Sequence, residues 1–231
     1  MQISGLEKLT VTDFPGFVSC IIFTQGCNFR CPFCQNSDLI NNKKGLISLE
    51  EIFDYLKKRK NILDGVVISG GEPTIQPDLK DFILKIKEMK LKVKLDTNGS
   101  NYKQLKELID LKLVDYVAMD IKNSFNHYNP ITGLEKVNLE NIKKSMELLK
   151  GSDIDFEFRT TLVKEYHTYE DILDICKHVG NSKYFLQNFQ NSECVLDKNL
   201  HGFTQEELKE FEKLRKEFPN VKVRDYGGKY V

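Results

Sequence analysis

The chain alternates short apolar runs with longer segments in which apolar residues recur every three or four positions. Ile52, Phe53 and Leu56 follow this helical spacing, whereas the short runs are rich in β-branched residues typical of strands. The predicted strands are Val18–Thr24, Gly65–Ser69, Lys92–Thr97, Val114–Ile121, Asp155–Leu162, Lys183–Phe189 and a weaker Val221–Arg224. The predicted helices are Leu49–Lys60, Leu79–Met89, Tyr102–Leu111, Leu139–Leu149, Tyr169–Val179 and Gln205–Glu217.

Three helix starts carry capping signals. Ser48 with Glu51, and Thr204 with Glu207, have the spacing of capping boxes, and Asp78 precedes the second helix. The result is six strand–helix units in strict alternation, which predicts an α/β fold with a parallel sheet and right-handed crossovers. Six units fall short of the eight that make a full barrel.

Composition limits the functions that need to be considered. The chain has 231 residues, so one domain spanning 1–231 is expected. It carries 34 basic and 34 acidic residues and has no net positive charge, so its composition does not indicate nucleic acid as a partner. The basic run Lys57–Lys60 closes a predicted helix, where cations suit the helix dipole. No apolar stretch is long enough to span a membrane, and residues 1–16 do not resemble a signal peptide. Clustered cysteines without an export signal favour the reducing cytoplasm.

Three cysteines lie in one short loop after the first predicted strand. Cys27, Cys31 and Cys34 have the spacing C-x3-C-x2-C. Three thiolates can hold three irons of a [4Fe–4S] cube and leave the fourth iron free to bind a small molecule. A zinc site would need a fourth ligand, and the other cysteines and the four histidines are scattered. A cube with an open iron is therefore expected, with zinc or an ordinary electron-transfer cluster as alternatives.

Polar residues follow the later predicted strands, where parallel α/β folds collect function. The second strand is followed by Gly70-Gly71-Glu72-Pro73, whose paired glycines would allow close backbone approach, although a plain turn is an alternative. Charged pairs on single strand faces predict a polar pit that could hold a ligand, or else a salt-bridge network of Asp120 with Lys122 or Arg159. Those faces carry Asp96 and Asn98, Asp120 and Lys122, Glu157 and Arg159, with Gln187 and Asn188 at the sixth strand.

The cysteine loop, with Phe33 directly before the last cysteine, resembles the signature of the radical S-adenosylmethionine (SAM) enzymes. Gly70–Pro73 resembles the GGEP motif of that family, which binds the methionine amino group of SAM. The resemblance implies a partial (βα)6 TIM-like barrel, one [4Fe–4S] cluster on Cys27, Cys31 and Cys34, and SAM bound at the open iron. The SAM contacts it implies are Phe33, Gln35, Gly70, Gly71, Glu72, Pro73, Asp96, Asn98, Asp120, Lys122, Arg159 and Gln187.

A narrower resemblance extends along most of the chain. The segments 13–16, 23–27, 94–99, 115–122, 157–161 and 186–189 are similar to the activating proteins of anaerobic ribonucleoside-triphosphate reductase, a group of the glycyl-radical enzyme activating enzymes. This implies an oxidoreductase that takes one electron from a flavodoxin or ferredoxin and cleaves SAM reductively. The deoxyadenosyl radical would then abstract the α-hydrogen of a glycine on a large partner enzyme.

Two further expectations concern the substrate. Only residues 35–47 separate the last loop cysteine from the first helix, and neither end shows a capping domain, so we expect an open mouth that admits a protein loop. The main alternative is a radical SAM enzyme acting on a small molecule, like the similarly short 7-carboxy-7-deazaguanine synthases. A non-enzymatic iron–sulfur carrier is less favoured because it needs no open iron.

The four histidines are expected at the surface, in loops or on helix faces.

Overall fold

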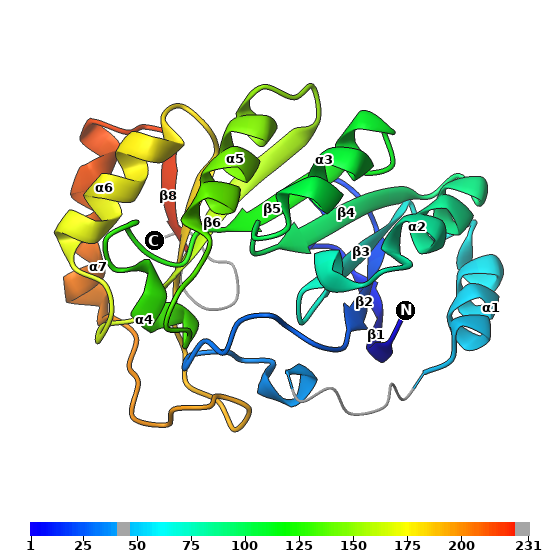
Figure 1. Ribbon diagram of the computed structural model, residues 1–231, viewed down its shortest axis with the longest axis horizontal. Helices are drawn as coiled ribbons and strands as arrows, with labels where there is room; N and C mark the ends of the chain where they lie inside the picture. The colour runs from blue at the N-terminus through cyan, green and yellow to red at the C-terminus, as the bar shows by residue number, and fades with distance from the viewer. Residues whose placement is uncertain (41–46, 225–231) are drawn as a thin grey trace. The chain divides into compact units, whose positions relative to one another are not determined.

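A computed structural model of the chain describes residues 1–40 and 47–224 (Figure 1). The chain divides into two compact units, and each is assembled from separate segments. The first contains Met1–Asn28, Asp38–Ala118 and Asn141–Asp155; the second contains Phe29–Ser37, Met119–Glu140 and Phe156 onwards. The boundary therefore falls inside the cysteine loop, so Cys27 belongs to the first unit while Cys31 and Cys34 belong to the second. Residues 41–46, within the short segment after the cysteines, lie outside the described residues.

The first unit contains four strands that follow one another in chain order. They are β1 (Ile3–Thr10), β2 (Ser19–Thr24), β3 (Gly65–Gly70) and β4 (Lys92–Thr97). β1 runs antiparallel to β2, whereas β2, β3 and β4 are parallel and in register. The helices are α1 (Leu49–Arg59), α2 (Leu79–Glu88), which packs on β4, and α3 (Tyr102–Asp110), with the 3-10 turn η2 (Pro73–Ile75) (Figure 1).

The second unit contains three parallel strands and their helices. They are β6 (Asp155–Leu162), β7 (Tyr184–Asn188), β8 (Val221–Arg224), α4 (Tyr128–Thr132), α6 (Tyr169–Val179), α7 (Gln205–Glu212) and the 3-10 turn η3 (Lys213–Lys216). α7 packs against α6 and β8 (Figure 1). The chain passes between the units within β5 (Tyr116–Asp120), α5 (Leu139–Lys150) and the turn η1 (Ser37–Leu39), and after Asp155, the first residue of β6. No helix among residues 1–40 and 47–224 is long and apolar enough to cross a membrane.

The six predicted strand–helix units and the last strand are confirmed, with ends that differ by one or two residues; the last predicted helix changes to the turn η3 after Glu212. β1 was not predicted, and its burial explains why: only Ile3 and Thr10, at its two ends, are buried, so it has no alternating pattern. A strictly parallel sheet is therefore wrong at this edge, where β1 is antiparallel.

α4 was also missed, because five residues are too few to show a helical period.

The capping predictions had different outcomes. Thr204 and Glu207 form the predicted capping box, and the Ser48 hydroxyl accepts a hydrogen bond from the Glu51 amide. Asp78 lies at the N-cap position of α2, as predicted, but its carboxylate makes no capping bond. That carboxylate accepts a hydrogen bond from the amino group of Met1 instead, which ties the start of the chain to the start of α2.

Candidate cofactor site

In the first unit, the turn after β3 packs directly on the start of the cysteine loop. The Gly71 amide donates to the Thr24 carbonyl (2.9 Å), and the Glu72 amide donates to the Gly26 carbonyl (2.8 Å). A Cβ added at Gly71 would lie 1.9 Å from the Gly26 oxygen, and Gly70 has φ +114°, so both positions require glycine. The paired glycines therefore allow a close backbone approach, and the turn lies against the residue that precedes Cys27.

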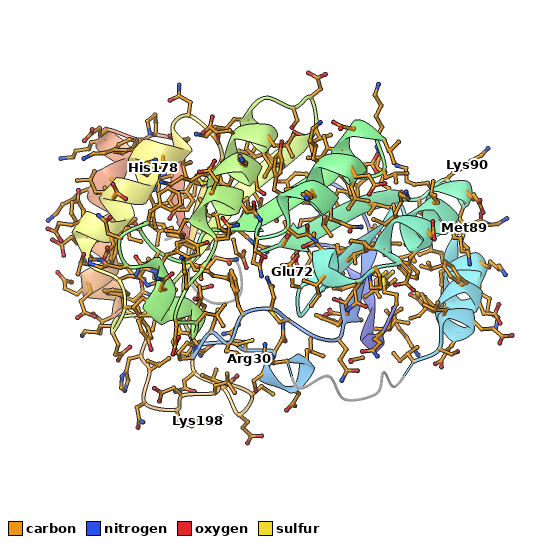
Figure 2. All side chains as sticks on the ribbon, in the orientation of Figure 1. Arg30, Glu72, Met89, Lys90, His178 and Lys198 are labelled. Carbon is orange, nitrogen blue, oxygen red and sulfur yellow. The ribbon has the colours of Figure 1, made fainter. Side chains whose placement is uncertain are left out.

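The Glu72 side chain, labelled in Figure 2, is buried and holds the turn to the end of β4. Its Oε1 accepts from the Thr74 amide (3.0 Å), the Thr74 hydroxyl (2.5 Å) and the Thr97 hydroxyl (2.7 Å), and its Oε2 accepts from the Asn98 amide (2.7 Å). Burial raises the pKa of this carboxyl, and the four hydrogen bonds oppose the shift. Glu72 thus acts as a connector between two loops that were both predicted to bind SAM.

Asn98 continues this connection to the cysteine loop. Its side-chain amide donates to the Asn28 side-chain oxygen (3.0 Å), and the Asn28 amide group donates to the Ser100 hydroxyl (2.7 Å). Sequence reasoning missed Asn28 and Ser100, and only the cysteine next to Asn28 marked that segment as functional. Both neighbours of Cys27 are therefore anchored, Gly26 by the turn after β3 and Asn28 by the residues after β4.

Asp96 lies near the carboxyl end of β4 with two partners of its own. Its Oδ1 accepts from the Lys94 ammonium (2.6 Å) and its Oδ2 from the Ser69 hydroxyl (3.0 Å). Lys94 is only 2% exposed, so this ion pair compensates a buried cation. In this structure Asp96 therefore has a structural partner in addition to its predicted role as a ligand of SAM.

The second unit holds the other two loop cysteines in a tight turn. The Cys34 amide donates to the Cys31 carbonyl (3.0 Å), and the Cys31 thiol is buried. Burial raises the pKa of Cys31 to about 11, although the nearby Lys122 ammonium opposes this, and burial likewise raises the pKa of Cys34. A thiolate is stable in such surroundings only beside added positive charge, such as a bound metal centre supplies.

Asp120, Lys122 and Arg159 form one charged network at the ends of β5 and β6. Asp120 Oδ2 lies 3.0 Å from Lys122 Nζ, and Asp120 Oδ1 lies 2.9 Å from Arg159 Nε. Burial disfavours every charge here, but the two cations hold the Asp120 pKa well below its usual range and Asp120 raises the Lys122 pKa. Lys122 Nζ also lies 5.7 Å from the centre of the Phe33 ring, so the network reaches the cysteine loop. The salt-bridge network considered from the sequence is therefore present.

Later segments of the second unit form hydrogen bonds with residues of the cysteine loop. The Arg30 amide donates to the Thr132 carbonyl (2.8 Å), and the Asp197 amide donates to the Pro32 carbonyl (3.0 Å). Gln35, predicted to contact SAM, donates through its side chain to the Gln190 carbonyl (3.0 Å). The loop conformation thus depends on residues about 100 and 160 positions further along the chain.

Gln187 lies in β7, paired with Thr161 of β6 and Arg224 of β8.

Among residues 1–40 and 47–224, no three His, Cys, Asp or Glu side chains are grouped so as to hold a single metal ion. In a [4Fe–4S] cube each thiolate binds a different iron, so its thiolates do not converge on one atom. The predicted residues thus divide between the two units: Gly70–Pro73, Asp96 and Asn98 lie in the first with Cys27, and the others lie in the second with Cys31 and Cys34.

His167 was expected at the surface and that prediction is wrong, because the ring is 3% exposed. The Val163 amide donates to Nδ1 (3.0 Å), so Nδ1 is the unprotonated nitrogen and Nε2 donates to the Lys122 carbonyl (2.9 Å). Nothing around His167 in the sequence indicates burial. The neutral ring therefore connects the start of α6 to the backbone of Lys122.

Burial lowers the pKa of His167. Above pH 6.5 the ring is neutral in both states, but below it the unfolded chain takes up a proton that the folded chain resists, so stability falls as pH falls. We expect the free energy of unfolding, from urea denaturation, to decline from pH 7 to pH 5. His167→Gln should flatten that decline, while the surface variant His178→Gln should keep it. An unchanged slope in His167→Gln would contradict this assignment.

Comparisons with known proteins agree with this geometry. The model of the radical SAM superfamily matches residues 21–179. A protein of Methanocaldococcus jannaschii named as a glycyl-radical enzyme activating enzyme is 36% identical over 242 residues, which covers 99% of this chain and 98% of that protein. The pyruvate formate-lyase-activating enzyme of Clostridium pasteurianum is 35% identical over 153 residues and 63% of each chain.

Solved structures show the same fold at lower identity. SuiB of Streptococcus suis superposes with a TM-score of 0.68 at 18% identity, over 90% of this chain and 48% of SuiB, so the chain spans about half the length of that protein. The enzyme anSMEcpe with bound AdoMet gives a TM-score of 0.60 at 19% identity, over 87% of this chain and 62% of the other. The partial-barrel α/β fold is thereby confirmed. The chain belongs to the radical SAM superfamily and, within it, to the glycyl-radical enzyme activating enzymes, which are oxidoreductases that use a [4Fe–4S] cluster and SAM.

Proposed function

We propose that this chain forms one radical SAM domain, spanning 1–231, that installs a glycyl radical on a large partner enzyme. The observation that carries the proposal is the anchoring of Cys27 between the turn after β3 and the end of β4. Gly71, Glu72 and Asn98 hold Gly26 and Asn28, the two neighbours of that cysteine. The superfamily match, residues 21–179, includes segments of both units, which supports a single domain.

The residues present fit the cofactors that the family implies. The close approach of Gly71 to Gly26 leaves no room for a Cβ, and the buried thiol of Cys31 needs added positive charge to ionise. Cys27, Cys31 and Cys34 would hold one [4Fe–4S] cluster per chain. When bound, cluster and SAM together supply one-electron cleavage of SAM and a radical that can take a hydrogen atom.

The chain's own residues would bind and orient SAM. The turn would meet SAM through the backbone of Gly70 and Gly71, because the Glu72 side chain already accepts four hydrogen bonds in the protein. The Glu72 and Pro73 carbonyls accept hydrogen bonds from the Ile75 and Gln76 amides. Arg159 or Lys122 would pair with the methionine carboxylate, with Asp120 holding both cations in place. Asp96, Asn98 and Gln187 would face the ribose and adenine, and Phe33 and Gln35 would contact SAM from the loop.

The partner and the electron donor are the finer parts of the proposal. The resemblance in segments 94–99, 115–122 and 157–161 favours anaerobic ribonucleoside-triphosphate reductase as the partner. Pyruvate formate-lyase is the competing partner, because activating enzymes of that name also match this chain. A flavodoxin or ferredoxin would supply the electron, and the reducing cytoplasm would protect an oxygen-sensitive cluster.

The test is SAM cleavage by the anaerobically reconstituted chain. Without a partner, formation of 5′-deoxyadenosine should be slow, and the correct glycyl-radical enzyme should accelerate it at least tenfold. Cys31→Ala should lose the activity and the iron, while the matched variant Cys176→Ala, at a buried cysteine outside the loop, should keep both. Acceleration by a purine or pterin precursor, with no response to either partner enzyme, would favour a small-molecule substrate and contradict the proposal.

A further inference from the structure

A basic cleft lies in the first unit at the amino ends of β3 and β4. Its rim carries Lys57, Lys60, Lys85, Lys90 and Lys92, and its volume is about 1060 Å³. Lys57 and Lys85 lie in the last turns of α1 and α2, and Lys60 directly follows α1. Lys90 lies between α2 and β4, and Lys92 is the first residue of β4. Figure 2 shows Lys90 at the end of α2. A cleft of this size lies just above the usual range for small-molecule sites.

The floor of the basic cleft is apolar. Phe17, Phe53, Leu63 and Leu91 contribute to its lining. The rings are covered by rim cations: Lys85 Nζ lies 5.5 Å from the centre of the Phe53 ring, and Lys92 Nζ lies 5.1 Å from that of Phe17. The cleft therefore offers aromatic surface and ammonium groups side by side.

Charge in the basic cleft is poorly balanced, although the whole chain is neutral. Five lysines line the cleft together with two carboxylates, Asp64 and Glu88. Asp54, outside the lining, pairs with Lys57 at 3.9 Å, so two positive charges remain. Asp64 is already engaged, since its Oδ2 accepts from the Val18 amide (2.9 Å). In the part of the chain that the structure describes, no carboxylate forms an ion pair with four of the five cations, Lys60, Lys85, Lys90 and Lys92.

Helix dipoles account for part of this charge only. The carboxyl ends of α1 and α2 each contribute roughly half a negative charge, which offsets about one lysine. Lys90 and Lys92 lie beyond the end of α2, so the dipoles do not explain them. About one positive charge remains, so the cleft is expected to attract an anion.

The basic cleft is separate from the cofactor site within the first unit. β3 begins at Gly65, next to the cleft residue Asp64, and ends at Gly70, where the turn against the cysteine loop starts. Six extended residues span about 16 Å. A ligand in the cleft would therefore lie at the amino ends of the strands, and the turn Gly70–Pro73 lies at their carboxyl ends.

We propose that the basic cleft binds a nucleotide. Lys85 and Lys92 would turn from the Phe53 and Phe17 rings to the phosphates, and the flat base would then lie against those rings. Inorganic phosphate alone would leave most of the volume and the apolar floor unused. The concave shape favours a small molecule over the flatter surface that a docked protein would need. This inference is independent of the function proposed above.

The test is calorimetric titration of the full chain with ATP at low ionic strength, repeated with SAM in excess. Binding should persist with SAM present and weaken as salt is added. The double variant Lys90→Gln/Lys92→Gln should lower the affinity at least tenfold. Inorganic tripolyphosphate should bind at least tenfold more weakly than ATP, because it has no base to lie on the rings.

The matched control is Lys112→Gln/Lys58→Gln. Lys112 shares the positive φ of Lys90 (54° against 63°), and Lys58 is an exposed lysine of α1, but neither lines the basic cleft. This control should change ATP affinity less than twofold. Four results would overturn the proposal: no binding of ATP, equal loss in the control, displacement by SAM, or tripolyphosphate binding as tightly as ATP. Binding of a polyglutamate peptide in place of ATP would identify an acidic protein ligand instead and also overturn it.

Discussion

Replacement of Asp120 by alanine is expected to lower the free energy of unfolding by about 3 kcal/mol, because it leaves two cations without their carboxylate. The side chains of Lys122 and Arg159 are only 15% and 16% exposed, and both lie within 3.0 Å of Asp120. The carboxylate itself is 31% exposed, which places the loss at the lower end of the range for broken buried pairs. Urea denaturation, followed by circular dichroism, measures the effect.

The control for this prediction is Asp110→Ala. Asp110 pairs with Lys106 at 2.6 Å, but both side chains are about half exposed, so the loss should be below about 0.5 kcal/mol. In the reconstituted protein, Asp120→Ala should also weaken SAM binding by about 1–3 kcal/mol, through the loss of a charged binding group. Equal stability losses in the two variants would contradict the buried-network account. Unchanged SAM affinity in Asp120→Ala would show that the network serves the fold alone.

Gly133→Ala is expected to disorganise the cysteine loop. Gly133 follows α4 with φ +67°, and an added Cβ would lie 2.2 Å from the Arg30 carbonyl oxygen, so α4 or the loop must move. The hydrogen bond from the Arg30 amide to the Thr132 carbonyl would be lost. Amide hydrogen exchange at Arg30 should accelerate at least tenfold, and iron uptake should fall, with a stability loss of about 2–4 kcal/mol.

Gly180→Ala separates this steric clash from backbone strain. Gly180 lies at φ +63° and ψ −132°, a region that suits a side chain less well than the φ +67° and ψ +21° of Gly133. Its Cβ would meet nothing within 4 Å. Strain alone therefore predicts the larger effect at Gly180, whereas the contact with Arg30 predicts that only Gly133→Ala changes iron uptake. Iron uptake that is reduced in Gly180→Ala and normal in Gly133→Ala would refute the contact argument.

The sequence was sufficient for most of the fold because most of the parallel strands are short runs rich in β-branched residues and each major helix has an apolar face. It also located the loop of Cys27, Cys31 and Cys34 and the turn at Gly71, since both signals are local in the chain. It failed for β1, whose middle is not buried and so leaves no pattern. It also failed for the carboxylate of Asp78, because the competing partner is the amino group of Met1, 77 residues away in the sequence.

The supporting contacts of the site could not be predicted, because they join distant segments. The role of Glu72 depends on Thr97 and Asn98, about 25 residues further along, and the burial of His167 depends on a carbonyl 45 residues before it. The sequence allowed Asp120 two roles, ligand binding or a salt-bridge network. The structure supplies the network, and the SAM affinity of Asp120→Ala tests whether the same residues also bind SAM.

Electron paramagnetic resonance of a partner enzyme tests the central claim most directly. The reconstituted chain, SAM and a reductant are incubated with anaerobic ribonucleoside-triphosphate reductase or pyruvate formate-lyase from the same organism. A glycyl radical should appear as a doublet split by one α-hydrogen. With partner protein labelled with α-deuterated glycine, the doublet should collapse and deuterium should appear in 5′-deoxyadenosine. Absence of the doublet with every glycyl-radical enzyme of that organism, from a chain that has its cluster and cleaves SAM, would contradict the claim.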